Sequence, residues 1–219
     1  MVAAFFDIDG TLARTNVVWA YAQLERARRS GWSQWFWALG IGACLPYYLW
    51  LDWQGRERFV KVFFRRYAGI PLEEARRFYK ATFPRRVQPR LLLDAVRQVE
   101  VHRQEGHRVV ILTGAPQVWA EPLAEFLRVD ALLASQLEVK EGRFTGRLAE
   151  PPLVGVEKAR QARRYAKEHG IHLAQSFAYA DSISDAPLLE AVGHPVAVNP
   201  DPCLKRLAVK RGWKIVRFR

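Results

Sequence analysis

The sequence predicts an open, mostly parallel α/β sheet with helices on both faces. Four short apolar runs each end at polar residues, and we predict them as strands: Val2–Phe6, Arg108–Leu112, Ser176–Ala180 and Pro195–Val198. Runs that are apolar throughout are typical of strands buried on both faces. Helical periodicity fills most of the chain between them, and strands that alternate with helices favour a parallel sheet. The 219 residues suffice for one such domain with a sizeable insertion.

The predicted helices follow the strands along the chain. Amphipathic patterns predict them at residues 89–105, 116–127, 156–169, 185–192 and 202–211. The last helix is the best delimited, because Asp201 is a suitable N-cap, Pro202 takes the first helical position and Gly212 follows the last periodic residue. The alternation of strand and helix therefore continues to the end of the chain.

Two segments interrupt this alternation. Residues 137–148 alternate apolar and polar around Glu141 and Gly142, which predicts a β-hairpin appended to the sheet. Residues 13–86 contain helical periodicity throughout and lack convincing strands. We therefore predict an α/β core domain formed by residues 1–12 and 87–219, with a helical cap domain at 13–86 inserted directly after the first strand.

Composition and charge exclude several classes of protein. Half of the residues are hydrophobic, which excludes a disordered chain. Cys44 and Cys203 are far apart and have neither Cys-x-x-Cys nor Cys/His ligand spacing, so neither a disulfide framework nor a structural zinc site is predicted. The first nine residues lack the basic region of a secretory signal, and we expect a cytoplasmic protein. The net charge is 34 − 22 = +12, which suits nucleic acid, an anionic membrane or a phosphorylated substrate.

Polar side chains follow three of the predicted strands. Asp7 and Asp9 follow the first, Thr113 and Gly114 the second, and Asp181 and Asp185 a later one, and these residues form the candidate site. Ligands bind beyond the carboxyl ends of the strands in open α/β sheets. Carboxylates that converge there repel each other unless a cation neutralises them, and an all-oxygen ligand set favours Mg²⁺. The sequence therefore predicts a magnesium site.

Each motif is weak on its own, but their order is specific. Alone, an Asp-x-Asp-Gly turn is usually a capped loop, Thr113 and Gly114 can be a cap and a turn, and Lys158 can be a solvated lysine. Together they resemble the four motifs of the haloacid-dehalogenase-like hydrolase superfamily, which lie here at Phe6–Leu12, Ile111–Gly114, Lys158 and Ala180–Leu188. The insertion after the first motif, the hairpin at 142–146 and the C-terminal tail resemble its phosphoserine-phosphatase-like subfamily IB. The resemblance covers nearly the whole chain and implies a Rossmann-like sheet.

The resemblance assigns a role to each candidate residue. It implies that Asp7 is the nucleophile, forming an aspartyl-phosphate, and that Asp9 is the acid and base. Asp7, Asp181 and the backbone carbonyl of Asp9 would hold Mg²⁺. It also implies that the phosphoryl group is held by Asp9, Gly10, Thr113, Gly114 and Lys158. Asp185 would orient the water molecules bound to the metal.

Three departures from the subfamily pattern bear on mechanism and substrate. Ala180 and Glu157 stand where glycine is common, and Glu157 directly precedes the proposed catalytic lysine. Phosphoserine phosphatases usually carry a glutamate pair soon after the second aspartate, whereas this chain has Arg14 in that stretch. Phosphoserine is therefore a disfavoured substrate.

The cap contains an uncharged, Trp- and Tyr-rich segment at residues 30–51, flanked by basic residues at 26–29 and 56–61. A single membrane span here would place Asp7 and Asp181 on opposite sides of the bilayer, so topology excludes it. Two interpretations stay open. The segment is either a buried helical hairpin, broken near Gly40 and Gly42 or at Pro46, or a surface that lies in a membrane interface and receives a lipid phosphate.

The sequence thus predicts a Mg²⁺-dependent phosphomonoesterase. Its partner is expected to be a lipid phosphate at an anionic inner membrane surface, or alternatively a soluble phosphorylated small molecule. A phosphotransferase with the same aspartyl-phosphate also stays open. A basic nucleic-acid-binding protein would explain the charge but not the order of the motifs, so no nucleic acid partner is expected.

Overall fold

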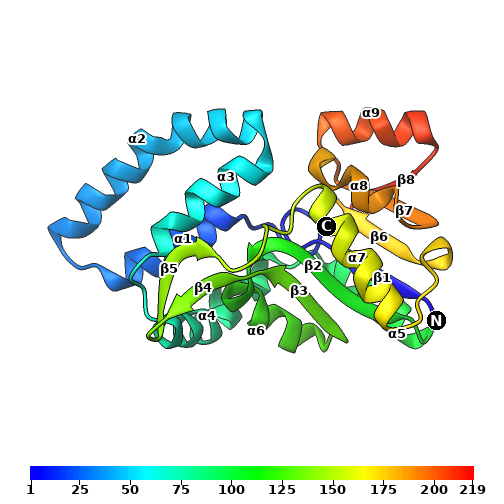
Figure 1. Cartoon of the computed structure of the whole chain (residues 1–219), viewed down its shortest axis with the longest axis horizontal. Helices are drawn as coiled ribbons and strands as arrows, with labels where there is room; N and C mark the ends of the chain where they lie inside the picture. Colours follow the sequence, from blue (N-terminus) through cyan, green and yellow to red (C-terminus); the bar gives the residue numbers. More distant parts are fainter.

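A six-stranded parallel sheet forms the centre of the molecule in the computed structural model (Figure 1). The structure describes the backbone of residues 1–219 and every side chain except those of Gln34, Phe36, Trp37, Ala38, Leu45, Leu49, Asp52 and Trp53. The strand order is β3-β2-β1-β6-β7-β8. The strands are β1 (Ala3–Phe6), β2 (Arg108–Pro116), β3 (Ala131–Ser135), β6 (Phe177–Ala180), β7 (His194–Val198) and β8 (Lys214–Val216).

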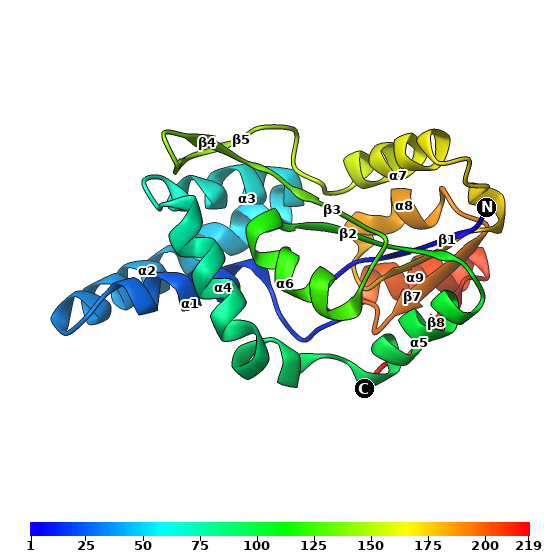
Figure 2. The ribbon, with the colours of Figure 1, turned by 90° about the horizontal axis from the view of Figure 1, so that it is seen from below.

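Helices cover both faces of this sheet, as predicted (Figure 2). Ala4 and Phe6 of β1 face a core shared with α5 (Leu93–Gln104) and α6 (Gln117–Leu127). Ala3 and Phe5 face the other core, which contains residues of α7 (Val156–Glu168), α8 (Ala186–Leu189) and α9 (Pro202–Arg211). The first strand is therefore buried on both sides, which explains why its sequence is apolar throughout.

The structure corrects the predicted limits of several core elements. β2 continues to Pro116, so Thr113 and Gly114 lie within the strand and not after it, because β3 pairs with this stretch across a register shift. The edge strands β3 and β8 were not predicted. Helix α5 begins at Leu93, after a 3₁₀ turn at Gln88–Arg90, and α8 is a single turn preceded by a 3₁₀ turn at Ile183–Asp185. A further 3₁₀ turn lies at Leu173–Gln175.

The insertion after β1 is helical throughout. It comprises α1 (Val17–Arg28), α2 (Trp32–Gln54), α3 (Arg56–Phe63), a 3₁₀ turn (Phe64–Tyr67) and α4 (Leu72–Arg86). Of the two open interpretations of residues 30–51, the broken helical hairpin is wrong: α2 is one helix that passes through Gly40 and Pro46 without a break. In Figure 1, α2 begins at the left end of the molecule and runs to the top of the view, above α3.

The hairpin of β4 (Leu137–Lys140) and β5 (Arg143–Leu148) turns at Glu141 and Gly142, as predicted. The prediction that it extends the main sheet is wrong, because the two strands form a separate sheet that lies on the cap. The Gly69 N–H donates to the Phe144 carbonyl (2.8 Å), and the Phe144 N–H donates to the Ile70 carbonyl (2.9 Å). The hairpin therefore lies in the sequence among the residues of the predicted core domain but is hydrogen-bonded to the helical insertion.

Candidate active site

The structure brings all the predicted site residues together around one cavity of about 240 Å³. They come from five segments at the carboxyl edge of the sheet: the turn after β1, the end of β2, the first turn of α7, the end of β6 and the 3₁₀ turn at Ile183–Asp185. The lining includes every one of Asp7, Asp9, Gly10, Thr113, Gly114, Lys158, Asp181 and Asp185. Their convergence follows from the parallel order of β2, β1 and β6.

A buried ion-pair cluster forms the floor of this cavity. Lys158 Nζ lies 2.8 Å from Asp7 Oδ1 and 2.8 Å from Asp185 Oδ2, and all three side chains are buried. Burial disfavours the ammonium charge, but the carboxylates of Asp185 and then Asp7 outweigh it and raise the pKa of Lys158. Lys158 is therefore a fixed positive charge that holds Asp7 in one orientation.

Glu157 does not disturb this cluster. Its carboxylate accepts hydrogen bonds from Arg160 (2.7 and 2.8 Å) and Gln161 (3.1 Å) on its own helix. Backbone freedom is instead supplied two residues earlier by Gly155, which has φ +56° and precedes α7. The glutamate at this position is therefore compatible with the placement of Lys158.

Asp9 is held by a residue of the following turn. The Thr15 hydroxyl donates to Asp9 Oδ1 at 2.8 Å. Burial, and then the Asp7 carboxylate, raise the pKa of Asp9 to about 6 despite this hydrogen bond. A carboxyl group with such a pKa can carry a proton near neutral pH and release it, which suits a general acid and base.

The other carboxylates form a site that fits a divalent cation. Burial, and then the charges of Asp7 and Asp185, raise the pKa of Asp181 to about 8. A bound cation would offset this repulsion, and the donors are the oxygens that Mg²⁺ prefers. Gly10 leaves the room that Asp181 needs, because a Cβ at Gly10 would lie 2.0 Å from Asp181 Oδ2. The residues therefore fit the predicted Mg²⁺, with Asp7, Asp181 and the Asp9 carbonyl as its expected ligands.

Thr113 and Gly114 shape the opposite wall. The Thr113 hydroxyl accepts a hydrogen bond from the Ala115 N–H (3.1 Å). A Cβ at Gly114 would lie 2.8 Å from Val154 Cγ1 and 3.2 Å from the Leu153 carbonyl oxygen. The glycine thus lets the segment that leads into α7 pack closely against β2, next to the cavity.

Sequence reasoning missed the residues that line the cavity from the cap, among them Arg56 and Asn16. Arg56 is the first residue of α3, and Asn16 is the N-cap of α1, where its side chain accepts from the Trp19 N–H (2.8 Å). The basic run at 56–61 was the available indication for Arg56, but only the fold brings α3 to the cavity.

Asp201 is another missed residue, and it acts on the loop that carries Asp181. Its Oδ1 caps α9, as predicted, while its Oδ2 accepts the Ile183 N–H (2.7 Å). Its own N–H donates to the Asp181 carbonyl (2.8 Å). Asp201 is therefore a positioning residue for the loop of residues 181–185.

Comparison with known sequences places the chain among hydrolases. The profile of the haloacid dehalogenase-like hydrolases matches residues 4–190. A probable phosphatase of Mycobacterium tuberculosis is 31% identical over 225 residues, covering 99% of this chain and 75% of that protein. An inhibition of morphological differentiation protein of Streptomyces azureus is 35% identical over 151 residues, covering 68% of this chain. The aligned part spans about half (54%) of that relative's length.

Solved structures share the fold. A protein of unknown function from Bordetella pertussis Tohama I has a TM-score of 0.84 at 26% identity, covering 98% of this chain and 97% of that one. A phosphoserine phosphatase solved as a phospho-aspartyl intermediate analogue has a TM-score of 0.70 at 19% identity, covering 98% and 91%; this second likeness shows the fold alone. The profile match and the 31% identity along 99% of its length show that this chain belongs to the haloacid dehalogenase-like hydrolase family.

Proposed function

We propose that this chain is a Mg²⁺-dependent phosphomonoester hydrolase that works through an aspartyl-phosphate. The observation that carries the proposal is the buried contact of Lys158 with Asp7 and Asp185 beside Asp9 and Asp181. This arrangement holds one carboxylate in a fixed orientation and places a second carboxyl, able to exchange a proton near neutral pH, on the same cavity. The phosphatase name of a relative that aligns along 99% of the chain supports it.

The chemistry divides into two displacements. A carboxylate oxygen of Asp7 attacks phosphorus, the bond to the ester oxygen breaks, and Asp9 gives its proton to the departing alcohol. Asp9 then takes a proton from a water molecule that attacks the phosphorus of the aspartyl-phosphate. Inorganic phosphate leaves, and Asp7 is again a free carboxylate. Mg²⁺ supplies charge neutralisation between the carboxylate and the phosphate dianion.

Lys158 and Asp185 support these displacements without forming bonds to phosphorus. The ammonium of Lys158 orients Asp7 through Oδ1 and offsets negative charge on the transferring group. Asp185 shares that ammonium through its own 2.8 Å contact, so Lys158 is held from two sides. Removal of Asp185 would therefore loosen both the lysine and the nucleophile.

The cap residues at the cavity favour a substrate without an amine beside its phosphate. Arg56 supplies a positive charge and Asn16 an amide, while Val17 and Val60 are apolar. Among the described lining residues the only carboxylates are Asp7, Asp9, Asp181 and Asp185, which the mechanism already uses. An ammonium group would find no further carboxylate among these described lining residues, whereas a second anionic or carbonyl group would meet Arg56.

We further propose that the phosphate is presented at a membrane surface, and the exposure of α2 favours this source. Trp32, Trp35 and Leu39 are 82%, 71% and 69% exposed. Large exposed aromatic side chains beside basic ones are typical of interfacial helices, and the basic segments at 26–29 and 56–61 flank α2. The side chain of Trp37 lies outside the described residues. Among the helices that the structure describes, none is both long and apolar enough to cross a membrane.

A phosphate-release assay with and without Mg²⁺ tests the proposal. The substrates are a generic aryl phosphate, phosphoserine, soluble sugar phosphates and lysophosphatidic acid, the last presented with and without anionic vesicles. We expect Mg²⁺-dependent release from the aryl ester, the highest kcat/KM for the lipid on vesicles, and little turnover of phosphoserine. A preference for soluble esters would reject presentation of the phosphate at a membrane and leave the proposed hydrolase standing. Product diverted to added alcohols would indicate a phosphotransferase.

A further inference from the structure

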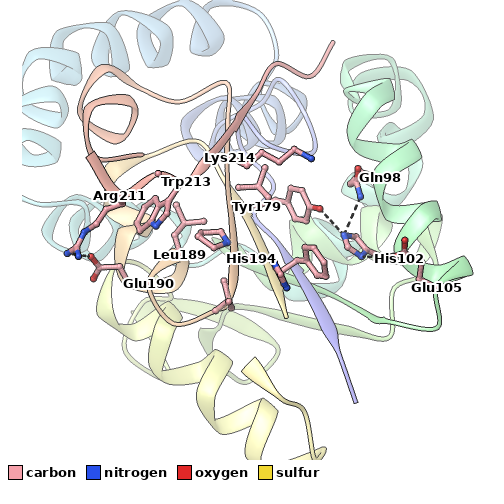
Figure 3. Close-up of a pocket in the computed structure, with 16 residues that line it drawn as sticks. Gln98, His102, Glu105, Tyr179, Leu189, Glu190, His194, Arg211, Trp213 and Lys214 are labelled. Atoms are coloured by element: carbon pink, nitrogen blue, oxygen red, sulfur yellow. Dashed lines mark hydrogen bonds and ion pairs between the residues drawn. The ribbon is translucent and has the colours of Figure 1, made fainter. Parts of the chain in front are cut away.

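A second cavity, of about 950 Å³, lies beside α5, β6 and β7 and reaches the ends of α8 and α9 (Figure 3). In the part of the chain that the structure describes, it shares no lining residue with the catalytic cavity. Figure 3 shows His102 between Gln98 and Tyr179, with Glu105 close by at the end of the helix. The hydrolase mechanism uses none of these side chains.

The end of α5 brings two histidines together. Gly106 adopts φ +72°, its N–H donates to the Arg103 carbonyl (3.0 Å), and the His107 N–H donates to the His102 carbonyl (2.9 Å). This pair of bonds is a Schellman turn, which places the residues at its two ends side by side. That contact is usually hydrophobic, but here it joins two imidazoles, whose Nδ1 atoms are 2.9 Å apart.

Glu105, within the same turn, completes a triangle of ligand atoms. Its Oε2 lies 3.3 Å from His107 Nδ1 and 3.7 Å from His102 Nδ1. Zinc bonds of about 2.1 Å in tetrahedral geometry separate neighbouring ligand atoms by about 3.4 Å. The three observed separations, from 2.9 to 3.7 Å, span this value, and all three atoms lie within 4.8 Å of one another.

The outer side of His102 is also arranged as in a metal site. His102 Nε2 lies 2.8 Å from the Tyr179 hydroxyl, and the imidazole is buried. A histidine that binds a metal through one nitrogen usually donates the N–H of its other nitrogen to an oxygen. With the proton on Nε2, Nδ1 carries a lone pair directed at His107 and Glu105.

We propose that His102, Glu105 and His107 bind a borderline divalent transition-metal ion, Zn²⁺ foremost, in a site separate from the Mg²⁺ site. Two imidazole nitrogens favour such an ion over Mg²⁺, which prefers oxygen. Three protein ligands leave a fourth position for water from the adjoining cavity. The ion would tie the end of α5 to the start of β2 and, through Tyr179, to β6. The sequence suggested no structural zinc site because it lacks Cys-x-x-Cys and Cys/His ligand spacing, and this set of two histidines and a glutamate matches neither pattern.

Zinc titration by calorimetry, with Mg²⁺ in excess, tests this site. An Asp181→Asn background weakens zinc binding at the catalytic cavity, so that the histidine site is measured separately. We expect one Zn²⁺ per chain in that background and at least about a tenfold loss of affinity in His107→Gln and Glu105→Gln. The matched control is His172→Gln, because His172 is exposed and does not belong to this ligand group. Tyr179→Phe should weaken zinc binding by roughly ten- to hundredfold through the outer hydrogen bond.

Co²⁺ provides a second measurement that does not depend on phosphatase activity. Tetrahedral Co²⁺ with nitrogen ligands absorbs strongly in the visible region, and this band should appear in Asp181→Asn and vanish in Asp181→Asn/His107→Gln. His107 and Glu105 are partly exposed, so their variants should fold. Equal zinc affinity in the two variants and the control would overturn the proposal, as would a lack of binding in Asp181→Asn. The histidines would then form only a hydrogen bond to each other.

Discussion

The catalytic cavity and helix α2 depart from the usual distribution of side chains in opposite directions. The cavity buries the charged groups of Asp7, Lys158 and Asp185, whereas α2 exposes the aromatic rings of Trp32 and Trp35. Buried charges are rare unless they are paired, and large exposed apolar groups that gather on one element are also uncommon. The comparison teaches that the two departures serve different roles in the proposed function: the buried charges hold the reacting groups, and the exposed rings contact the membrane surface.

The largest expected effect is the loss of turnover on substitution of the nucleophile. Asp7→Asn keeps the volume of the side chain but removes the attacking oxygen, so phosphate release should fall by at least about 10³-fold. Steady-state release from an aryl phosphate measures this. Asp94→Asn, an aspartate outside the cavity, is the control and should keep its activity. Substantial turnover by Asp7→Asn would contradict the proposed role.

Lys158→Met should reveal how much stability the buried ion pairs require. Without the ammonium, Asp7 and Asp185 are left as uncompensated buried carboxylates, and the free energy of unfolding should fall by about 3–5 kcal/mol. Urea unfolding at pH 7 with a chelator measures this. Lys167→Met, an exposed lysine on the same helix, should change the value by less than about 0.5 kcal/mol. A similar small change in Lys158→Met would indicate that the pairs carry little energy.

The raised pKa values of Asp9 and Asp181 predict an unusual dependence of stability on pH. In the folded chain these groups bind protons at pH values where the unfolded chain, with pKa near 3.8, does not. The free energy of unfolding in the presence of a chelator should therefore rise as pH falls from about 8 towards 4, by up to about 1.4 kcal/mol per pH unit for each additional proton.

Mg²⁺ should flatten this dependence, because it binds the ionised carboxylates. Asp181→Asn should also reduce the slope between about pH 8 and 6, since the amide does not titrate. Chemical unfolding at several pH values compares the three conditions. Equal slopes in Asp181→Asn and in the chelated wild-type protein would show that Asp181 is ionised throughout this range.

The smallest expected effect concerns α2, and it separates the exposed side of the helix from its buried side. Trp32→Ala and Trp35→Ala should weaken binding to anionic vesicles severalfold and change the free energy of unfolding by less than about 0.5 kcal/mol. Tyr48 and Leu51 lie on the buried side, so Leu51→Ala should instead cost about 2–5 kcal/mol. Vesicle co-sedimentation and thermal melts measure the two quantities. Wild-type protein that fails to sediment with vesicles would reject the membrane surface.

The sequence predicted which residues gather at the carboxyl edge of the sheet, because they follow strand ends. Asp7 and Asp181 each directly follow an apolar run, and parallel pairing of β1 with β6 is sufficient to bring them together. Lys158 was assigned by resemblance, and only the structure shows its two 2.8 Å contacts. The sequence could not predict Arg56 as a cavity residue, because its position depends on how α3 packs and no local pattern specifies that packing.

Elsewhere the sequence pattern was ambiguous for physical reasons. The edge strand β8 has three residues and is mostly exposed, so it lacks the apolar run of a buried strand. The edge strand β3 was missed although it begins with an apolar run, and three of its five residues are only half-buried. The hairpin was recognised from its alternation, but alternation does not say which surface covers the apolar side. The uncharged stretch at 30–51 suggested either a buried segment or a membrane interface. The side chains that the structure describes on α2 include both buried and exposed ones.

The backbone hydrogen bonds between Phe144 and residues 69–70 have a consequence for folding on the ribosome. The ring of Phe144 meets that of Tyr67 edge-on at 5.9 Å, and both side chains are buried. About sixty residues after the end of the cap must therefore be synthesised before Phe144 can cover this side of Tyr67. A nascent chain that ends before Phe144 would present an aromatic surface to chaperones, and limited proteolysis of stalled chains would detect its closure.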